Sequence, residues 1–174
     1  MIISVATYNQ LPIIKELAYQ IWPIAYGDIL SNRQLDYMLD LIYSIESLEN
    51  QINKKQVFLL VSFENEYVGF ASYELNFEDE KHKEIENNLN QVKTKIHKLY
   101  ILPQIQGKGI GKKIIDYIKD IAIFNENNSI ILNVNRFNKA KDFYLKYGFK
   151  ITKEIKINIG NGYIMDDYVM ELFF

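Results

Sequence analysis

The sequence contains no cysteine among its 174 residues. This absence excludes disulfide bonds, thiolate metal sites and a cysteine nucleophile together. Basic residues are not in excess, because the net charge is −2, so nothing favours nucleic-acid binding. No apolar run approaches the ~20 residues that cross a bilayer, and MIISVATYNQ lacks the basic and apolar segments of a signal peptide. We therefore expect a soluble, cytoplasmic protein without nucleic-acid or membrane partners, either a monomer or a homodimer.

The composition that is present is that of a globular chain. Hydrophobic residues make up 48% and charged residues 24%, which excludes a disordered protein. The length favours one domain, residues 1–174. With 13 Tyr and 10 Phe, most aromatic rings must lie in a core or line a pocket.

Hydrophobic periodicity predicts elements in the order β-α-α-β-β-β-α-β-α-β-β. Helices are expected from Asn9 onward, after Ser31, from Ile110 and over 138–148. Pro23 should bend or end the first helix, Ser31 and Gln34 form a plausible capping box, and Gly148 should stop the last helix. Strands are expected at 2–6, 56–63, 67–75, 95–102 and 129–135, followed by a closing hairpin around NIGNG. Residues 76–94 are polar and charged, which is typical of a surface excursion.

The segment QGKGIGKK, residues 106–113, lies between an expected strand and an expected helix. A Walker A loop and a dinucleotide fingerprint both need a glycine where Lys112 stands, so neither fits. The remaining pattern is Q-x-x-G-x-G, formed by Gln106, Gly109 and Gly111. Glycines let backbone N–H groups converge on one point, and the following helix adds its positive N-terminal end. Gln106 can donate from its amide, and neighbouring lysines raise the potential. The alternative is a tight turn with solvated lysines.

Two segments carry a family resemblance. KLYILPQIQGKGIGKKIIDYI resembles the acetyl-CoA-binding motif of the GNAT superfamily of N-acetyltransferases. VNRFNKAKDFYLKYGFK is similar to the strand, helix and FY…GF segment that follow it in that family. The resemblance covers the whole element order and implies an α/β (α+β) fold, with a mixed, mostly antiparallel central sheet flanked by helices. It also implies an acetyl-CoA-dependent acetyltransferase.

The resemblance assigns the cofactor contacts. The pantetheine arm falls on the backbone of Leu99, Tyr100 and Ile101, as in strand addition. The pyrophosphate falls on Gln106, Gly107, Lys108, Gly109, Ile110 and Gly111, with Lys112 at the helix start. Where the family usually has an asparagine this chain has Phe137, so Asn135 or Asn138 takes over that contact.

Tyr144 matches the family's tyrosine that protonates the leaving thiolate; the alternative is that it only packs. His97 is the candidate base, acting directly or through water, because it shares one side of its strand with Leu99. The alternative is an ordinary exposed histidine.

The amine acceptor should contact the first two helices and the closing hairpin. One of Asp166 and Asp167 should face inward, since neighbours on a strand alternate. The candidates on the helices are Trp22, Tyr26, Gln34 and Tyr37, with Trp22 equally well a core residue. The stretch GNGYIMDDYVMEL is also similar to bacterial polyamine acetyltransferases. We expect transfer to a small-molecule amine such as a polyamine; the alternatives are a protein or peptide amine, a non-catalytic CoA sensor, and a nucleotide-binding or scaffold protein.

Overall fold

The computed structural model describes residues 1–78 and 92–174. Most of the expected polar excursion, including His82, lies outside these residues. The chain forms two compact units. Unit 1 contains Met1–Ser72 and Lys98–Ile114, and unit 2 contains Tyr73–His97 and Ile115–Phe174. The prediction of a single domain remains a prediction.

Seven strands form one mixed sheet with the order β1-β2-β3-β4-β5-β7-β6. Their bounds are Ile2–Val5 for β1, Val57–Phe63 for β2, Glu66–Phe77 for β3, Lys93–Ile101 for β4, Ser129–Asn135 for β5, Lys150–Gly160 for β6 and Tyr163–Phe173 for β7. The β4–β5 pair is parallel, while β1–β2, β5–β7 and β6–β7 are antiparallel. The expected fold class is confirmed.

The helices that lie wholly in unit 1 are α1 (Leu11–Tyr26), α2 (Asn32–Tyr43) and α3 (Ile45–Asn53). The expected apolar stripe of α1 is buried, including Leu11, Ile14 and Ile21. Pro23 does not end α1, which continues to Tyr26. One missing N–H near a helix end removes a single bond, so the last turn survives. Ser31 caps α2 by accepting a hydrogen bond from the Gln34 backbone at 3.2 Å.

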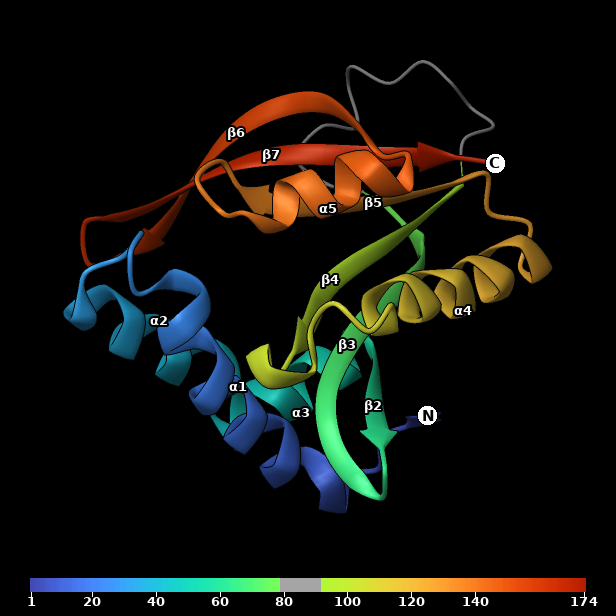
Figure 1. Cartoon of the computed structure of the whole chain (residues 1–174). Coiled ribbons are helices and arrows are strands. Elements are labelled where there is room, and N and C mark those ends of the chain that lie inside the picture. The colour runs from blue at the N-terminus through green and yellow to red at the C-terminus, as the bar shows by residue number, and fades with distance from the viewer. Residues whose placement is uncertain (79–91) are drawn as a thin grey trace. The chain divides into compact units, whose positions relative to one another are not determined.

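Unit 2 holds most of α4 (Ile110–Phe124), all of α5 (Ala140–Tyr147) and the C-terminal strands. α4 buries one apolar face, including Ile115, Ile118 and Ala122. Gly148 ends α5 in the left-handed region, at φ 119°, as its sequence position predicts. The closing hairpin forms from β6 and β7, which lie side by side in Figure 1.

Candidate active site

The glycine loop of unit 1 follows the short 3-10 helix η2 (Pro103–Ile105) and leads into α4. Gly107 and Gly109 have φ of 80° and 74°, which side chains rarely adopt. A Cβ at either position would meet no protein atom within 4 Å. The loop therefore turns by means of glycine and leaves open space in front of its backbone, as an anion site at a helix N-terminus requires.

Two loop side chains make local contacts that the sequence did not predict. Gln106 donates its amide Nε2 to the carbonyl oxygen of Ile101 at 3.1 Å. Lys108 places its Nζ 5.1 Å from the ring centroid of Phe63, as a cation–π contact. The Gln106 amide therefore ties the loop to the end of β4.

The C-terminal end of β4 lies beyond its pairing with β5. The paired residues run from Lys93 to Ile96, so the segment Leu99–Ile101 follows them. On the β3 side the backbones approach closely: a Cβ on Gly69 would lie 2.5 Å from the Tyr100 carbonyl oxygen. We did not predict this role for Gly69, although a glycine inside a strand is a signal of close backbone approach.

Of the aromatic acceptor candidates in unit 1, Tyr26 contacts Trp22, and Tyr100 of β4 joins them. The Trp22 ring lies 4.8 Å from Tyr26 and 5.8 Å from Tyr100, and the Tyr26 and Tyr100 hydroxyls are 3.1 Å apart. Trp22 is only 3% exposed, so the core alternative applies to most of its surface. Gln34 and Tyr37 lie half-buried on α2.

Tyr43 lies beneath this cluster and is fully buried. Neither its hydroxyl nor the Trp22 Nε1 has an aligned hydrogen-bond partner among the described residues. Burial raises the pKa of Tyr43 well above its usual value, and polar contacts with Trp22 and Tyr100 oppose this only in part. The cluster is therefore tightly packed, with Tyr26 and Tyr100 at its less buried side.

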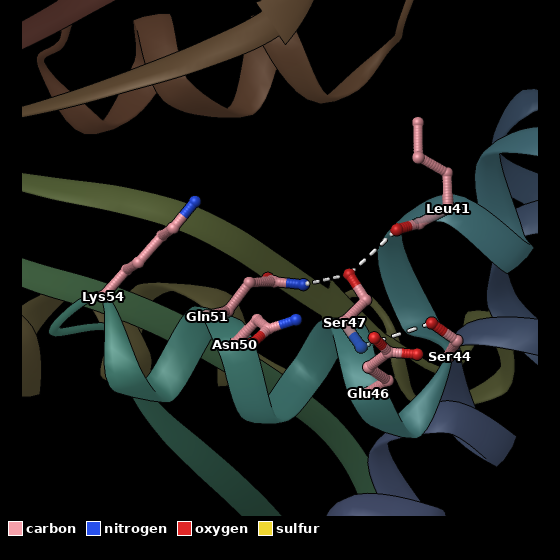
Figure 2. A pocket seen from close by; sticks show the side chains of 7 residues that line it. All are labelled: Leu41, Ser44, Glu46, Ser47, Asn50, Gln51 and Lys54. Carbon is pink, nitrogen blue, oxygen red and sulfur yellow. Dashed lines mark hydrogen bonds between the residues drawn. The ribbon is translucent and has the colours of Figure 1, made fainter.

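A pocket of about 360 Å³ lies where α2 meets α3. Figure 2 shows its lining side chains: Leu41, Ser44, Glu46, Ser47, Asn50, Gln51 and Lys54. Gln51 donates to the Ile42 carbonyl at 2.7 Å and to Ser47 at 3.1 Å. Its carbonyl oxygen accepts a hydrogen bond from the buried ammonium of Lys98. The pocket contains no sequence-predicted site residue, and its hydrogen bonds fix the corner between the two helices.

Tyr144 lies in unit 2 on α5 and is 7% exposed. Its ring centroid is 5.6 Å from Phe149 and 5.2 Å from Phe143. Tyr147, one turn along, donates its hydroxyl to Asp116 at 2.5 Å, and burial together with this bond raises its pKa. Tyr147 thus has a structural partner, which makes it a natural control for Tyr144.

Asn135 and Asn138 each stabilise the turn between β5 and α5. The Asn135 Oδ1 accepts from the Phe137 backbone at 3.0 Å, and the Asn138 Oδ1 accepts from the Ala140 backbone at 2.8 Å. Each side chain therefore uses its oxygen within the turn. Phe137 stands between them with 70% of its surface exposed.

His97 is not an ordinary exposed histidine. Its Nε2 lies 2.9 Å from Oε2 of Glu74, and the two side chains are 17% and 18% exposed. The Phe77 ring contacts the imidazole edge-on at 6.0 Å. We did not predict Glu74; an acidic residue inside an apolar strand was the available signal.

The two aspartates of β7 face opposite ways, as strand alternation predicts. Asp166 accepts a hydrogen bond from Arg136 at 3.0 Å. Asp167 is 1% exposed, and its Oδ1 has no hydrogen-bond partner in the described residues. Burial, followed by the charge of Asp166, raises the pKa of Asp167 to about 6, while Lys95 acts in the opposite direction. Asp167 is therefore the inward-facing carboxyl.

Among residues 1–78 and 92–174, every helix is too short or too polar to span a lipid bilayer. Within the same part of the chain, no group of three His, Asp or Glu side chains could hold a metal ion.

Comparison with known proteins agrees with this geometry. Residues 30–172 match the sequence model of the acetyltransferase (GNAT) domain. Among solved structures, the PaiA N-acetyltransferase of Thermoplasma acidophilum, in complex with coenzyme A, aligns over 100% of both chains with a TM-score of 0.75 and 24% identity. The ribosomal-protein-alanine N-acetyltransferase of Brucella melitensis also covers 100% of both chains, with a TM-score of 0.64 and 19% identity.

A third similar structure is YncA, a putative acetyltransferase of Salmonella typhimurium with acetyl-CoA as its cofactor. It has a TM-score of 0.61 and 19% identity, over 99% of this chain and 93% of that one. The TM-scores of these three structures establish a shared fold, and the family match extends over most of the sequence. The chain belongs to the GNAT family of acetyltransferases.

Proposed function

We propose that this acetyltransferase moves the acetyl group of acetyl-CoA directly to a primary amine of a small cationic molecule, with polyamines as the first candidates. The glycine loop supports this cofactor, because Gly107 and Gly109 adopt left-handed backbone angles and a Cβ on either would enter open space. Two of the similar proteins were solved with coenzyme A or acetyl-CoA, which supports the same cofactor here.

The absence of cysteine excludes a thiol acyl-enzyme and so supports direct transfer. Acetyl-CoA supplies a thioester whose acetyl carbon the amine attacks. At neutral pH the acceptor is mostly an ammonium, because its pKa is near ~10, so it must first lose a proton. His97 takes that proton from the ammonium and later releases it to water. Tyr144 gives its hydroxyl proton to the sulfur and regains one from the acetylated nitrogen. Two protons leave the nitrogen: one reaches water and the other ends on the thiol.

One observation carries the choice of acceptor: the buried Asp167 with an oxygen that has no partner in the described residues. A buried carboxyl oxygen without a hydrogen-bond partner lowers the stability of the fold. Such a group is retained where a bound ligand can donate the missing hydrogen bond. An ammonium at the far end of a diamine or polyamine has the required charge and donors.

The test is an amine panel with release of free CoA as the readout. The panel contains spermidine, spermine, a monoamine of similar length, an aminoglycoside, and a peptide with a free N-terminus. We expect turnover with the polyamines and a markedly lower kcat/KM with the monoamine, which has no distal ammonium. Turnover with the peptide alone would contradict the proposed acceptor.

A further inference from the structure

Glu74 and His97 form a pair within unit 2. They belong to β3 and β4, which are neighbours in the sheet, and their Oε2 and Nε2 atoms are 2.9 Å apart. An ionised carboxylate only accepts hydrogen bonds, so Nε2 must carry the hydrogen. The lone pair of the neutral ring is then on Nδ1. The pair therefore favours the Nε2–H tautomer of His97, in which Nδ1 is the nitrogen that can accept a proton.

The surroundings contain charges of both signs. Lys95 shares the strand side of His97 by alternation, and its Nζ lies 4.3 Å from the Phe77 ring centroid. Asp167 on β7 is close enough to Lys95 for the ammonium to lower its pKa. Of these groups, the Glu74 carboxylate touches the imidazole directly, so it is the charge that most favours an imidazolium.

We propose that Glu74 is a positioning residue for acetyl transfer, which holds the Nε2–H of His97 so that Nδ1 takes the proton from the acceptor ammonium. This inference rests on the proposed function. In the step, the N–H bond of the ammonium breaks and an Nδ1–H bond forms. The products are a neutral amine and an imidazolium paired with the Glu74 carboxylate. The imidazolium then passes its proton to water, which restores the starting state.

Glu74→Gln separates this role from a structural one. Glutamine has almost the same shape and can still hydrogen-bond to the ring, but it carries no charge and can donate as well as accept. Removal of an opposite charge at this distance should lower the pKa of His97 by about one unit or more. Glu66→Gln is the matched control, because it removes the same charge from an exposed position of β3.

The chain offers a clean spectroscopic test, since it contains only two histidines, His82 and His97. In a His82→Gln background, nitrogen NMR of the remaining ring reports its tautomer and its titration without any need for turnover. We expect the Nε2–H tautomer when Glu74 is present. In Glu74→Gln the midpoint should fall by about one pH unit, whereas Glu66→Gln should leave it unchanged.

The second measurement is the pH profile of kcat/KM for the amine substrate, in the same variants. In Glu74→Gln the acid limb should move to lower pH by the shift seen in NMR, and the plateau value of kcat/KM should be lower. Glu74→Asp should restore part of the original profile. An NMR midpoint that does not move, or a limb that stays in place while the midpoint moves, would overturn the role of Glu74. Failure of the proposed function is a different outcome: no amine is acetylated, while the NMR result still reports the pair.

Discussion

Each unit contains a buried ionisable side chain, and the two side chains differ in how fully they are hydrogen-bonded within the protein. Lys98 in unit 1 is 7% exposed, yet its ammonium donates to Gln51 and to Gln56, the latter at 3.3 Å, and faces the rings of Tyr43 and Phe58. Asp167 in unit 2 is 1% exposed and has an oxygen without a partner in the described residues. Burial lowers the pKa of Lys98 to about 7 and raises that of Asp167 to about 6.

The difference separates packing from function. A buried polar group whose bonds are made within the protein stabilises one arrangement of the core. A buried polar group that lacks a hydrogen-bond partner destabilises the fold, and such groups are typical of sites where a ligand supplies the partner. We therefore assign Lys98 to the structure of unit 1 and propose Asp167 for the acceptor. Substitution of Asp167 should therefore change catalysis, whereas substitution of Lys98 should change stability alone.

The largest expected effect extends this comparison to Tyr144. Tyr144→Phe keeps the ring against Phe149 and deletes only the hydroxyl, so turnover should fall by roughly ten- to ten-thousand-fold, the range for a lost general acid. The affinity for CoA should change little. Steady-state kinetics and calorimetric titration measure the two quantities.

Tyr147→Phe is the matched control on the same helix. It removes the hydroxyl that donates to Asp116, so it should cost about 1 kcal/mol of stability and leave turnover nearly unchanged. Equal losses of turnover in the two variants would show that Tyr144 acts through packing.

The next largest effect is expected for Asp167→Asn, which should lower kcat/KM for the polyamine acceptor and stabilise the fold. Loss of a buried carboxylate partner should reduce kcat/KM for a polyamine by about 30-fold or more, and that for a monoamine much less. Between its ordinary pKa of 3.8 and its folded value of about 6, Asp167 binds more protons in the folded state. The wild type therefore loses stability as the pH rises through this window.

Asparagine has no such titration. Its advantage in stability should be about 3 kcal/mol above pH ~6 and should disappear below pH ~4. Urea unfolding at several pH values measures it. A variant that is destabilised at every pH, with unchanged kinetics, would move Asp167 into the same class as Lys98.

Lys98→Met is expected to change stability and not catalysis. The ordinary pKa of lysine is 10.5 and the folded value is about 7, so between these limits the unfolded state binds more protons. Wild-type stability should therefore rise with pH above 7, by at most about 1.4 kcal/mol per pH unit, whereas the Met variant should lack this slope. Unfolding midpoints at pH 7, 8 and 9 measure the difference. Parallel curves for both proteins would mean that Lys98 stays charged through other contacts.

The sequence predicted local features well because they depend on neighbours along the chain. The stripe of α1, the Ser31 cap, the turn at Gly148 and the closing hairpin all follow from spacing and residue type. The family resemblance, now confirmed as membership, added the architecture of the sheet.

Contacts between strands and helices were harder to predict. Glu74 and His97 are 23 positions apart, and although an acidic residue inside an apolar strand is a signal for Glu74, nothing local identifies His97 as its partner. Lysines are mostly exposed in folded proteins, but alternation places Lys98 on the buried side of its strand with Ile96. Its partners Gln51 and Gln56 lie more than 40 positions away, so only the assembled unit shows how the ammonium is satisfied.

The central claim, that the glycine loop binds coenzyme A, has a matched pair of glycines as its test. Gly109 in unit 1 and Gly162 in unit 2 have φ of 74° and 76°, and a Cβ on either meets nothing within 4 Å. Valine at either site should impose similar strain, on the order of 1–3 kcal/mol. Only at Gly109 should it also occupy the space of a phosphate.

The decisive measurement is the thermal shift caused by CoA in the wild type, Gly109→Val and Gly162→Val. At ~100 times its dissociation constant, CoA should add about 2.7 kcal/mol of stability to the wild type and to Gly162→Val. It should add none to a folded Gly109→Val, and ATP and NAD should stabilise none of the three proteins. An equal CoA shift in all three, or stabilisation by ATP without CoA, would contradict the account.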